Sequence, residues 1–206
     1  MTPVQPVRRA AADKDWSAAD PGADLRLVGG AGTLRRLLRP AVLETQRSAT
    51  GRVLDLRGPL AGGFAYDSAE ELVVRPATEP GGRSDEQFDT ICSFGALAAA
   101  RRLEEFVASL RPLVAPGGRL LFVELDGDAR RWRRRLDRIA RRFWGASMAG
   151  DISGALWAGG FELTSLDRRP LRIRGPGLLR VVVGAARLDP HRSGGPPQHG
   201  TGDAAL

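Results

Sequence analysis

The sequence predicts an α/β fold: a mostly parallel sheet with helices on both faces and an antiparallel hairpin at its C-terminal end. Three observations indicate it. Strand-like and helix-like apolar patterns alternate through the middle of the chain. The segment 88–125 contains a strand, an amphipathic helix, a Pro-Gly-Gly turn and a second strand, which together form a β-α-β unit. The last two predicted strands, 161–166 and 179–185, have no helical pattern between them and should pair antiparallel.

The N-terminal part of the domain is expected to hold one helix and two short strands. The helix is predicted over 33–47, with Thr33 as its N-cap and leucines along one face. Pro40 lies inside this segment and should kink or break the helix. Short apolar runs at 52–56 and 71–75 predict the two strands.

The β-α-β unit begins with a strand over 89–94, whose unbroken apolar pattern is typical of a strand covered on both faces. The helix after it separates its charged residues from an apolar stripe. The stripe contains Leu97, Leu103, Phe106, Val107 and Leu110. Pro116-Gly117-Gly118 then turns the chain into a strand over 119–125. This turn is assigned a structural role, because glycine tolerates positive φ.

Two more helices are expected before the closing hairpin. The first, over 128–143, carries an apolar stripe at helical spacing and arginine on most of its remaining surface. The stripe contains Trp132, Leu136, Ile139 and Phe143. The second is predicted over 151–157, with Asp151 as N-cap and a Gly-Gly end.

Four short motifs occur in a fixed order: Phe88-Asp89 opening a strand, a turn at 113–118, the strand start at 119–124, and Ala158-Gly159-Gly160-Phe161 leading into another strand. In this order they resemble the class I S-adenosylmethionine-dependent methyltransferases of the methyltransferase type 11 kind, over roughly residues 52–187. The resemblance implies a Rossmann-like fold, with S-adenosylmethionine as cofactor.

The resemblance also implies a cofactor site at the carboxyl ends of the strands. In this family the first strand leads into a D-x-G-x-G-x-G loop. Asp55 fits that pattern, whereas Arg57 stands where the first glycine would be and fills space that the backbone needs to approach a ligand. The candidate cofactor-binding residues are Asp55, Arg57, Gly58, Gly62, Ser93 and Phe94.

The chain is shorter than the family pattern before Phe88, so part of the N-terminal half of the family sheet should be missing. Two alignments of strand 71–75 are considered. If it is the second strand, Arg75 replaces the acidic residue that would hold the ribose hydroxyls. If it is the third, Ala77 replaces a polar residue near the adenine. The gap-free spacing to Phe88 favours the third strand.

Other chemistry is sparse, and the sequence indicates no catalytic residue. Both histidines, His191 and His199, lie in the C-terminal tail, so neither a metal site nor a histidine-dependent triad is expected. Asp126 and Asp128 follow a strand and could face the cleft, but such aspartates are more typical of turns and N-caps. Methyl transfer depends mainly on positioning the reactants, so this scarcity does not exclude it.

Composition predicts one domain over 25–189, with disordered tails at 1–24 and 190–206 that are rich in Pro, Gly and polar residues. No apolar run is long enough to span a membrane, and the arginines near the N-terminus precede no apolar signal segment. Cys92 is the only cysteine, which excludes an internal disulfide and favours a reducing cytoplasm.

The net charge of +7 and the pI of about 11.1 raise nucleic acid or anionic membrane as partners of the arginine-rich segment 128–143. We favour the alternative that these arginines face solvent while the apolar stripe packs on the domain. The basic residues are nearly all arginine, as a GC-rich genome would produce.

Three functions are therefore carried forward. The first is a methyltransferase that acts on a small or lipid-like molecule. The second is an inactive methyltransferase-fold protein that serves as a binding or regulatory protein, with a protein partner. The third is a basic module that binds nucleic acid or anionic membrane through 128–143.

Overall fold

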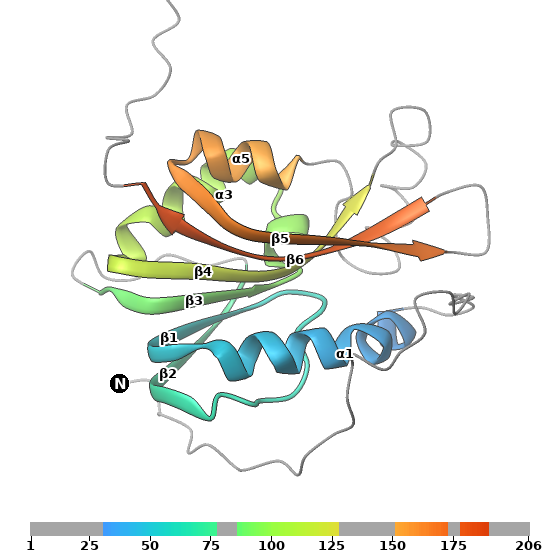
Figure 1. Ribbon diagram of the computed structural model, residues 1–206, viewed down its shortest axis with the longest axis horizontal. Coiled ribbons are helices and arrows are strands. Elements are labelled where there is room, and N and C mark those ends of the chain that lie inside the picture. The colour runs from blue at the N-terminus through green and yellow to red at the C-terminus, as the bar shows by residue number, and fades with distance from the viewer. Residues whose placement is uncertain (1–30, 78–85, 128–150, 173–177, 190–206) are drawn as a thin grey trace, which may run out of the picture.

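The computed structural model describes residues 31–77, 86–127, 151–172 and 178–189 (Figure 1). The predicted tails, the arginine-rich helix over 128–143 and both histidines lie outside these residues. Among the helices that are described, none is long and apolar enough to cross a membrane.

Six strands form one sheet in the order β2-β1-β3-β4-β6-β5. Their bounds are β1 Thr50–Arg57, β2 Ser68–Pro76, β3 Phe88–Phe94, β4 Val114–Gly127, β5 Phe161–Arg172 and β6 Leu178–Leu188. The strands from β2 to β4 pair in parallel, while β6 pairs antiparallel with both β4 and β5. The predicted mostly parallel sheet with a C-terminal antiparallel hairpin is thereby confirmed.

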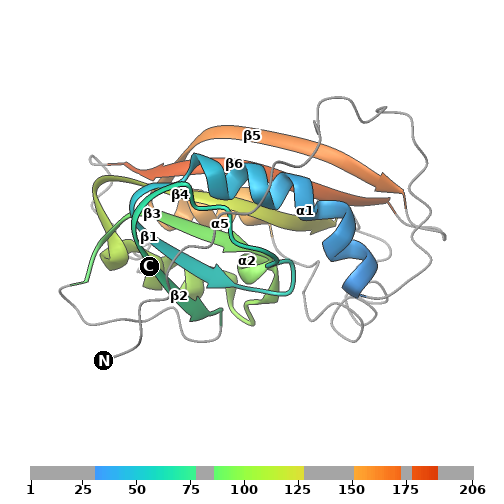
Figure 2. The same ribbon diagram turned by 90° about the horizontal axis from the view of Figure 1, so that it is seen from below.

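Helices cover both faces of the sheet, as predicted. α1 (Ala31–Ser48) lies along one face, and α2 (Ala96–Ala99), α3 (Leu103–Leu110) and α5 (Ile152–Ala158) lie on the other (Figures 1 and 2). A single turn of 3₁₀-helix, η2 (Arg111–Leu113), joins α3 to β4.

Two helix predictions need correction. α1 continues through Pro40 without a break. Proline removes one hydrogen bond, to the carbonyl four residues earlier, and that carbonyl belongs to Arg36 on an exposed part of the helix where water can replace the donor. The single helix expected after β3 is instead two short ones, α2 and α3, because the backbone is extended at Ala100 and Arg102.

Alternation along each strand divides the buried side chains into two cores. Val53 packs in the α1-side core with Leu34, Leu38 and other residues, whereas Leu54 packs in the core beneath α2, α3 and α5. The sheet is therefore the middle layer of three. Burial of residues 90–94 in β3 and 120–125 in β4 explains why these stretches are mostly apolar.

β2 pairs directly with β1, which is the position of the second strand in a doubly wound sheet. The alignment with the family's third strand, which the spacing to Phe88 favours, assumes that the second strand is missing, and it stays a prediction. The position of β2 follows from the short connection at 58–67, which holds no helix and returns the chain to the start of the adjacent strand. Within this connection Leu60, Ala65 and Tyr66 are buried.

Replacement of Leu38 tests how strongly α1 stabilises the sheet. Leu38 is 3% exposed in the α1-side core, so Leu38→Ala should lower the free energy of unfolding by about 2–5 kcal/mol in urea denaturation. The neighbouring exposed residue supplies the control, and Arg39→Ala should change stability by less than about 0.5 kcal/mol. Equal effects of the two changes would contradict this role of α1.

Candidate functional site

The candidate site lies between the carboxyl ends of β1 and β3. The chain order reverses here, because β2 follows β1 on one side while β3 lies on the other side. In open α/β sheets such a switch point forms the crevice that takes ligands. Two segments border it, the β1–β2 connection at 58–67 and the turn at 94–96 that joins β3 to α2.

These two segments are in direct contact across the crevice. The Leu60 N–H donates to the Phe94 carbonyl at 3.2 Å. A Cβ on Gly58 would lie 2.5 Å from both the Ala96 nitrogen and the Gly95 carbonyl carbon, so only glycine allows this approach. Gly95 has a φ of +76°, and a Cβ there would lie 2.9 Å from the Leu60 side chain.

The residues present do not fit an adenosyl cofactor in this arrangement. Leu60 is 2% exposed, and its side chain packs against Gly95 of the facing turn. The glycine at position 58 therefore allows one loop to pack on another.

The Arg57 side chain contacts the β1–β2 connection near its middle, at Gly63 and Phe64. Its Nη2 donates to the Gly63 carbonyl at 3.0 Å, and its guanidinium carbon lies 4.2 Å from the centre of the Phe64 ring. Its Nε is 3.7 Å from the nearer carboxylate oxygen of Asp55. Arg57 thus ties residues 57–64 together.

Asp55 is fully buried, and neither of its carboxylate oxygens has a hydrogen-bond partner among the described residues. The Tyr66 hydroxyl, which lies nearby, is likewise unpaired. Burial raises the pKa of Asp55 from its usual value near 3.8 to about 6, against the opposing effects of the Arg57 charge and the Tyr66 hydroxyl.

Cys92 is the neighbour of Asp55 on β3. Burial, together with the negative charge of Asp55, raises the pKa of the Cys92 thiol well above its usual range. A cysteine reacts as its thiolate, so this thiol is poorly suited to act as a nucleophile.

Ser93 and Phe94 point away from each other, to opposite faces of the sheet. Phe94 is buried in the α1-side core. The Ser93 hydroxyl donates to Glu124 at 2.6 Å, and the same carboxylate accepts from the N–H groups of Leu97 at 3.2 Å and Ala98 at 3.0 Å. Glu124 therefore fastens the start of α2 to the end of β4.

Glu124 is the polar residue at this edge whose role sequence analysis missed. It is fully buried, and burial raises its pKa from its usual value near 4.5 to about 7, although its hydrogen bonds favour the charged form. One signal was present in the sequence: an acidic residue inside an otherwise apolar strand.

The structure thus brings only some of the six candidate residues together. Asp55 and Arg57 lie at the β1–β2 connection, and Gly58 meets the backbone of Phe94. The hydroxyl of Ser93 is engaged on the opposite face, and a Cβ on Gly62 would meet no atom within 4 Å. Their role toward a cofactor stays a prediction. The described residues contain no cluster of side chains suited to a metal ion.

A second hollow, of about 410 Å³, lies between α1 and the sheet over β4, β6 and β5. Its lining includes Glu44 and Thr45 from α1, and Leu121, Asp167 and Val183 from the strands. It forms because α1 covers the α1-side face only in part.

Comparison with known proteins supports the fold. No family model and no curated protein matches the sequence. Among solved structures, a protein from Bacillus halodurans C-125 assigned as a methyltransferase matches with a TM-score of 0.54 and 15% identity, over 72% of this chain and 98% of that one. The fold is that of the class I methyltransferases.

Other solved structures match with lower TM-scores. The N-methyltransferase NodS from Bradyrhizobium japonicum WM9 matches with a TM-score of 0.49 and 15% identity, over 76% of this chain and 97% of that one. The trans-methyltransferase CalH, solved as a complex with SAH, matches with a TM-score of 0.45 and 17% identity, over 77% and 60% of the two chains. At such identities the likeness concerns the fold alone.

Two glycine substitutions test whether position 58 serves loop packing. Gly58→Ala would place a methyl group 2.5–2.6 Å from three backbone atoms, so the free energy of unfolding should fall by about 1–3 kcal/mol. Gly62→Ala, in the same connection, should leave stability unchanged or raise it by up to about 1 kcal/mol. Chemical denaturation measures both, and a neutral Gly58→Ala would refute the packing role.

Asp55 should make the protein less stable as pH rises. Because its folded-state pKa of about 6 exceeds the usual value near 3.8, its favourable contribution is complete below about pH 4 and is lost as pH rises through 6. Asp55→Asn should therefore raise the free energy of unfolding by up to about 3 kcal/mol at pH 8 and leave it unchanged at pH 3. Asp67→Asn, at an exposed position, is the control and should change the free energy of unfolding by less than about 0.5 kcal/mol.

Proposed function

We propose that this chain uses the methyltransferase fold as a binding or regulatory protein and does not take S-adenosylmethionine into the crevice between β1 and β3. The observation that carries the proposal is the packing of Gly58 and Leu60 against the turn at 94–96. The chain's own backbone and side chains fill the space that a cofactor would need.

Opening the crevice would have a free-energy cost. The Leu60 side chain would lose its burial, about 1.5–3 kcal/mol, and its N–H would give up the Phe94 carbonyl. The contacts of Arg57 with Gly63 and Phe64 would have to change as well. Any ligand that binds only the open state has its affinity reduced by the small population of that state.

The end of β2 also lacks the chemistry for a ribose. Two vicinal hydroxyls are held well by a carboxylate that accepts from both, whereas a guanidinium only donates. Arg75 occupies the carboxyl end of β2, beside the end of β1, and is ion-paired with Glu86.

One observation favours the other candidate, an active methyltransferase with a small or lipid-like substrate. Asp55 is a buried carboxylate without a hydrogen-bond partner among the described residues, at the end of β1 where the family keeps an acidic residue. With the connection displaced, this carboxylate could accept from a ligand. Such an enzyme would need a second conformation of residues 58–67.

Calorimetric titration of the full-length protein with S-adenosylmethionine and with S-adenosylhomocysteine tests the proposal. We expect no saturable heat, meaning a Kd weaker than about 1 mM for either ligand. The matched variant is Arg57→Gly, which restores the family glycine and releases Gly63 and Phe64. Saturable binding by the wild-type protein that Gly58→Ala abolishes would overturn the proposal and establish the crevice as a working cofactor site.

A further inference from the structure

β2 forms one edge of the sheet, and no described residue pairs with its outer side. The Ala77 N–H donates to the Arg57 carbonyl of β1 at 3.2 Å. Backbone direction alternates along a strand, so the N–H and carbonyl groups of Arg75 and Val73 also face β1. Those of Val74 and Leu72 face outward. Pro76, which has no N–H, has the outward orientation that an edge strand tolerates.

The sequence of β2 is arranged with opposite charges at its two ends. Glu71 precedes the apolar centre, Leu72 to Val74, and Arg75 follows it. Val74 is 40% exposed, which is unusual for a large apolar side chain in a strand of this protein. Such an outer edge, apolar at its centre, can accept another strand.

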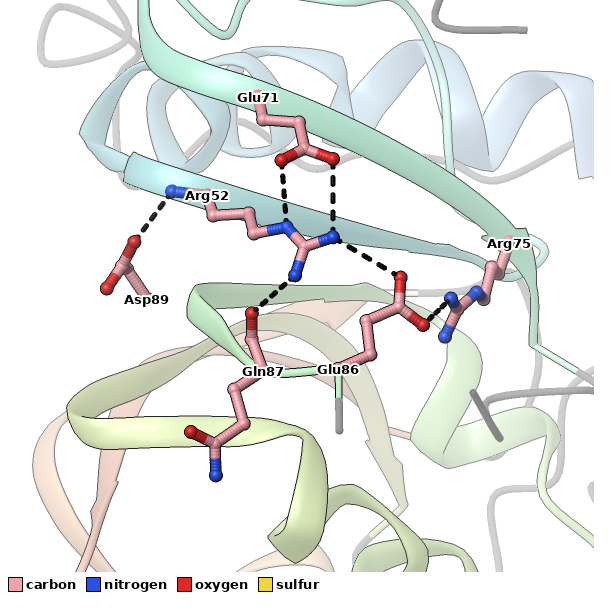
Figure 3. A network of polar contacts seen from close by, with 6 residues as sticks. All are labelled: Arg52, Glu71, Arg75, Glu86, Gln87 and Asp89. Carbon is pink, nitrogen blue, oxygen red and sulfur yellow. Dashed lines mark hydrogen bonds and ion pairs between the residues drawn. The ribbon is translucent and has the colours of Figure 1, made fainter. Parts of the chain in front are cut away.

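The charges continue inward as a row on the face beneath α2 and α3 (Figure 3). Glu71 binds Arg52 through two contacts, at 2.9 and 3.3 Å, and Arg52 lies 3.6 Å from Glu86. Glu86 in turn pairs with Arg75. Both guanidinium groups lie over the Phe88 ring, 4.9 and 5.7 Å from its centre.

The row alternates in sign and ends at Arg75 with a donor to spare. The Nη1 of Arg75 is buried and has no hydrogen-bond partner among the described residues. Arg75 is thus the last charge of the row on β2, and Glu71 is the other charge of the row on this strand.

We propose that two copies of this chain associate through their β2 edges, antiparallel, with the two-fold axis at Val73. In this register Glu71 lies directly opposite Arg75 of the partner subunit, and the reverse pair forms by symmetry. Leu72 lies opposite Val74 of the partner subunit, and their outward N–H and carbonyl groups bond each other. The two sheets become one continuous sheet.

Other registers lose this complementarity. A shift of one residue would turn the apolar side chains to the wrong face. An axis at Leu72 would place Glu71 opposite Val73, and an axis at Val74 would place Arg75 opposite Val73, so both would leave the charges unpaired. Directly opposed charges of unlike sign contribute about 0.2–1 kcal/mol per pair, and like charges destabilise.

Sedimentation equilibrium of the full chain over a wide concentration range tests the association. We expect a reversible monomer–dimer equilibrium. Val74→Pro should abolish it, because it removes an outward N–H while leaving the hydrogen bonds to β1 in place, and circular dichroism should show the monomer folded. A wild-type protein that stays monomeric, or a dimer that persists in Val74→Pro, would overturn the proposal.

Charge reversal tests the register. Glu71→Arg and Arg75→Glu should each weaken self-association by roughly tenfold, because each places like charges opposite one another. Mixing the two variants should restore dimers, because every opposed pair is then of unlike sign. Single variants that dimerise like the wild type, or a mixture that stays monomeric, would exclude this pairing.

Cross-linking tests the position of the axis. Val73 would face its own copy in a pair without backbone hydrogen bonds, with a Cα–Cα distance of about 4.5 Å that a disulfide can span. Val73→Cys should form a covalent dimer under oxidising conditions, whereas Val74→Cys should not. The native Cys92 is buried and does not compete. Equal cross-linking of both variants would refute the register.

Discussion

The contact between the β1–β2 connection and the turn after β3 determines how much space is left for a ligand at the carboxyl ends of β1 and β3. One hydrogen bond, from the Leu60 N–H to the Phe94 carbonyl, joins two segments at the switch point, where open α/β sheets bind ligands. The glycines at 58 and 95 make the approach sterically possible, and the side chain of Leu60 seals it. Together these contacts hold the β1–β2 connection against the turn at 94–96.

Two buried carboxylates flank this contact and act differently. Glu124 accepts three hydrogen bonds and fixes the start of α2, so its burial is matched by polar contacts. Asp55 is buried without any comparable set of donors. The hydrogen bonds of Glu124 fix the position of the turn at 94–96. The charged form of Asp55, by contrast, is destabilised by burial, because few groups nearby can stabilise it.

Sequence reasoning predicted most of the fold and little of the site. The β-α-β unit over 88–125 was predictable because its strands are buried on both faces, which leaves an unbroken apolar pattern. The pairing of β2 with β1 was not, because spacing along the chain does not reveal whether another strand lies between them. The split between α2 and α3 was hidden for a similar reason, because Glu124, which holds the start of α2, comes from the distant β4. The sequence identified Arg57 as a departure from the glycine pattern. Its hydrogen bond to the Gly63 carbonyl could not be predicted, because it depends on how the connection at 58–67 folds.

The missing helix between β1 and β2 has a consequence for the order of folding. Strands joined by so short a connection can meet early, because the entropy lost on closing a loop grows with its length. β4, by contrast, pairs with β6, which lies beyond the whole of α5 and β5. During synthesis the edge of β4 must therefore wait unpaired for the last strand of the domain. The half that contains β1 and β2, where the connection is short, can therefore assemble first. The β5–β6 hairpin at the other end completes the fold.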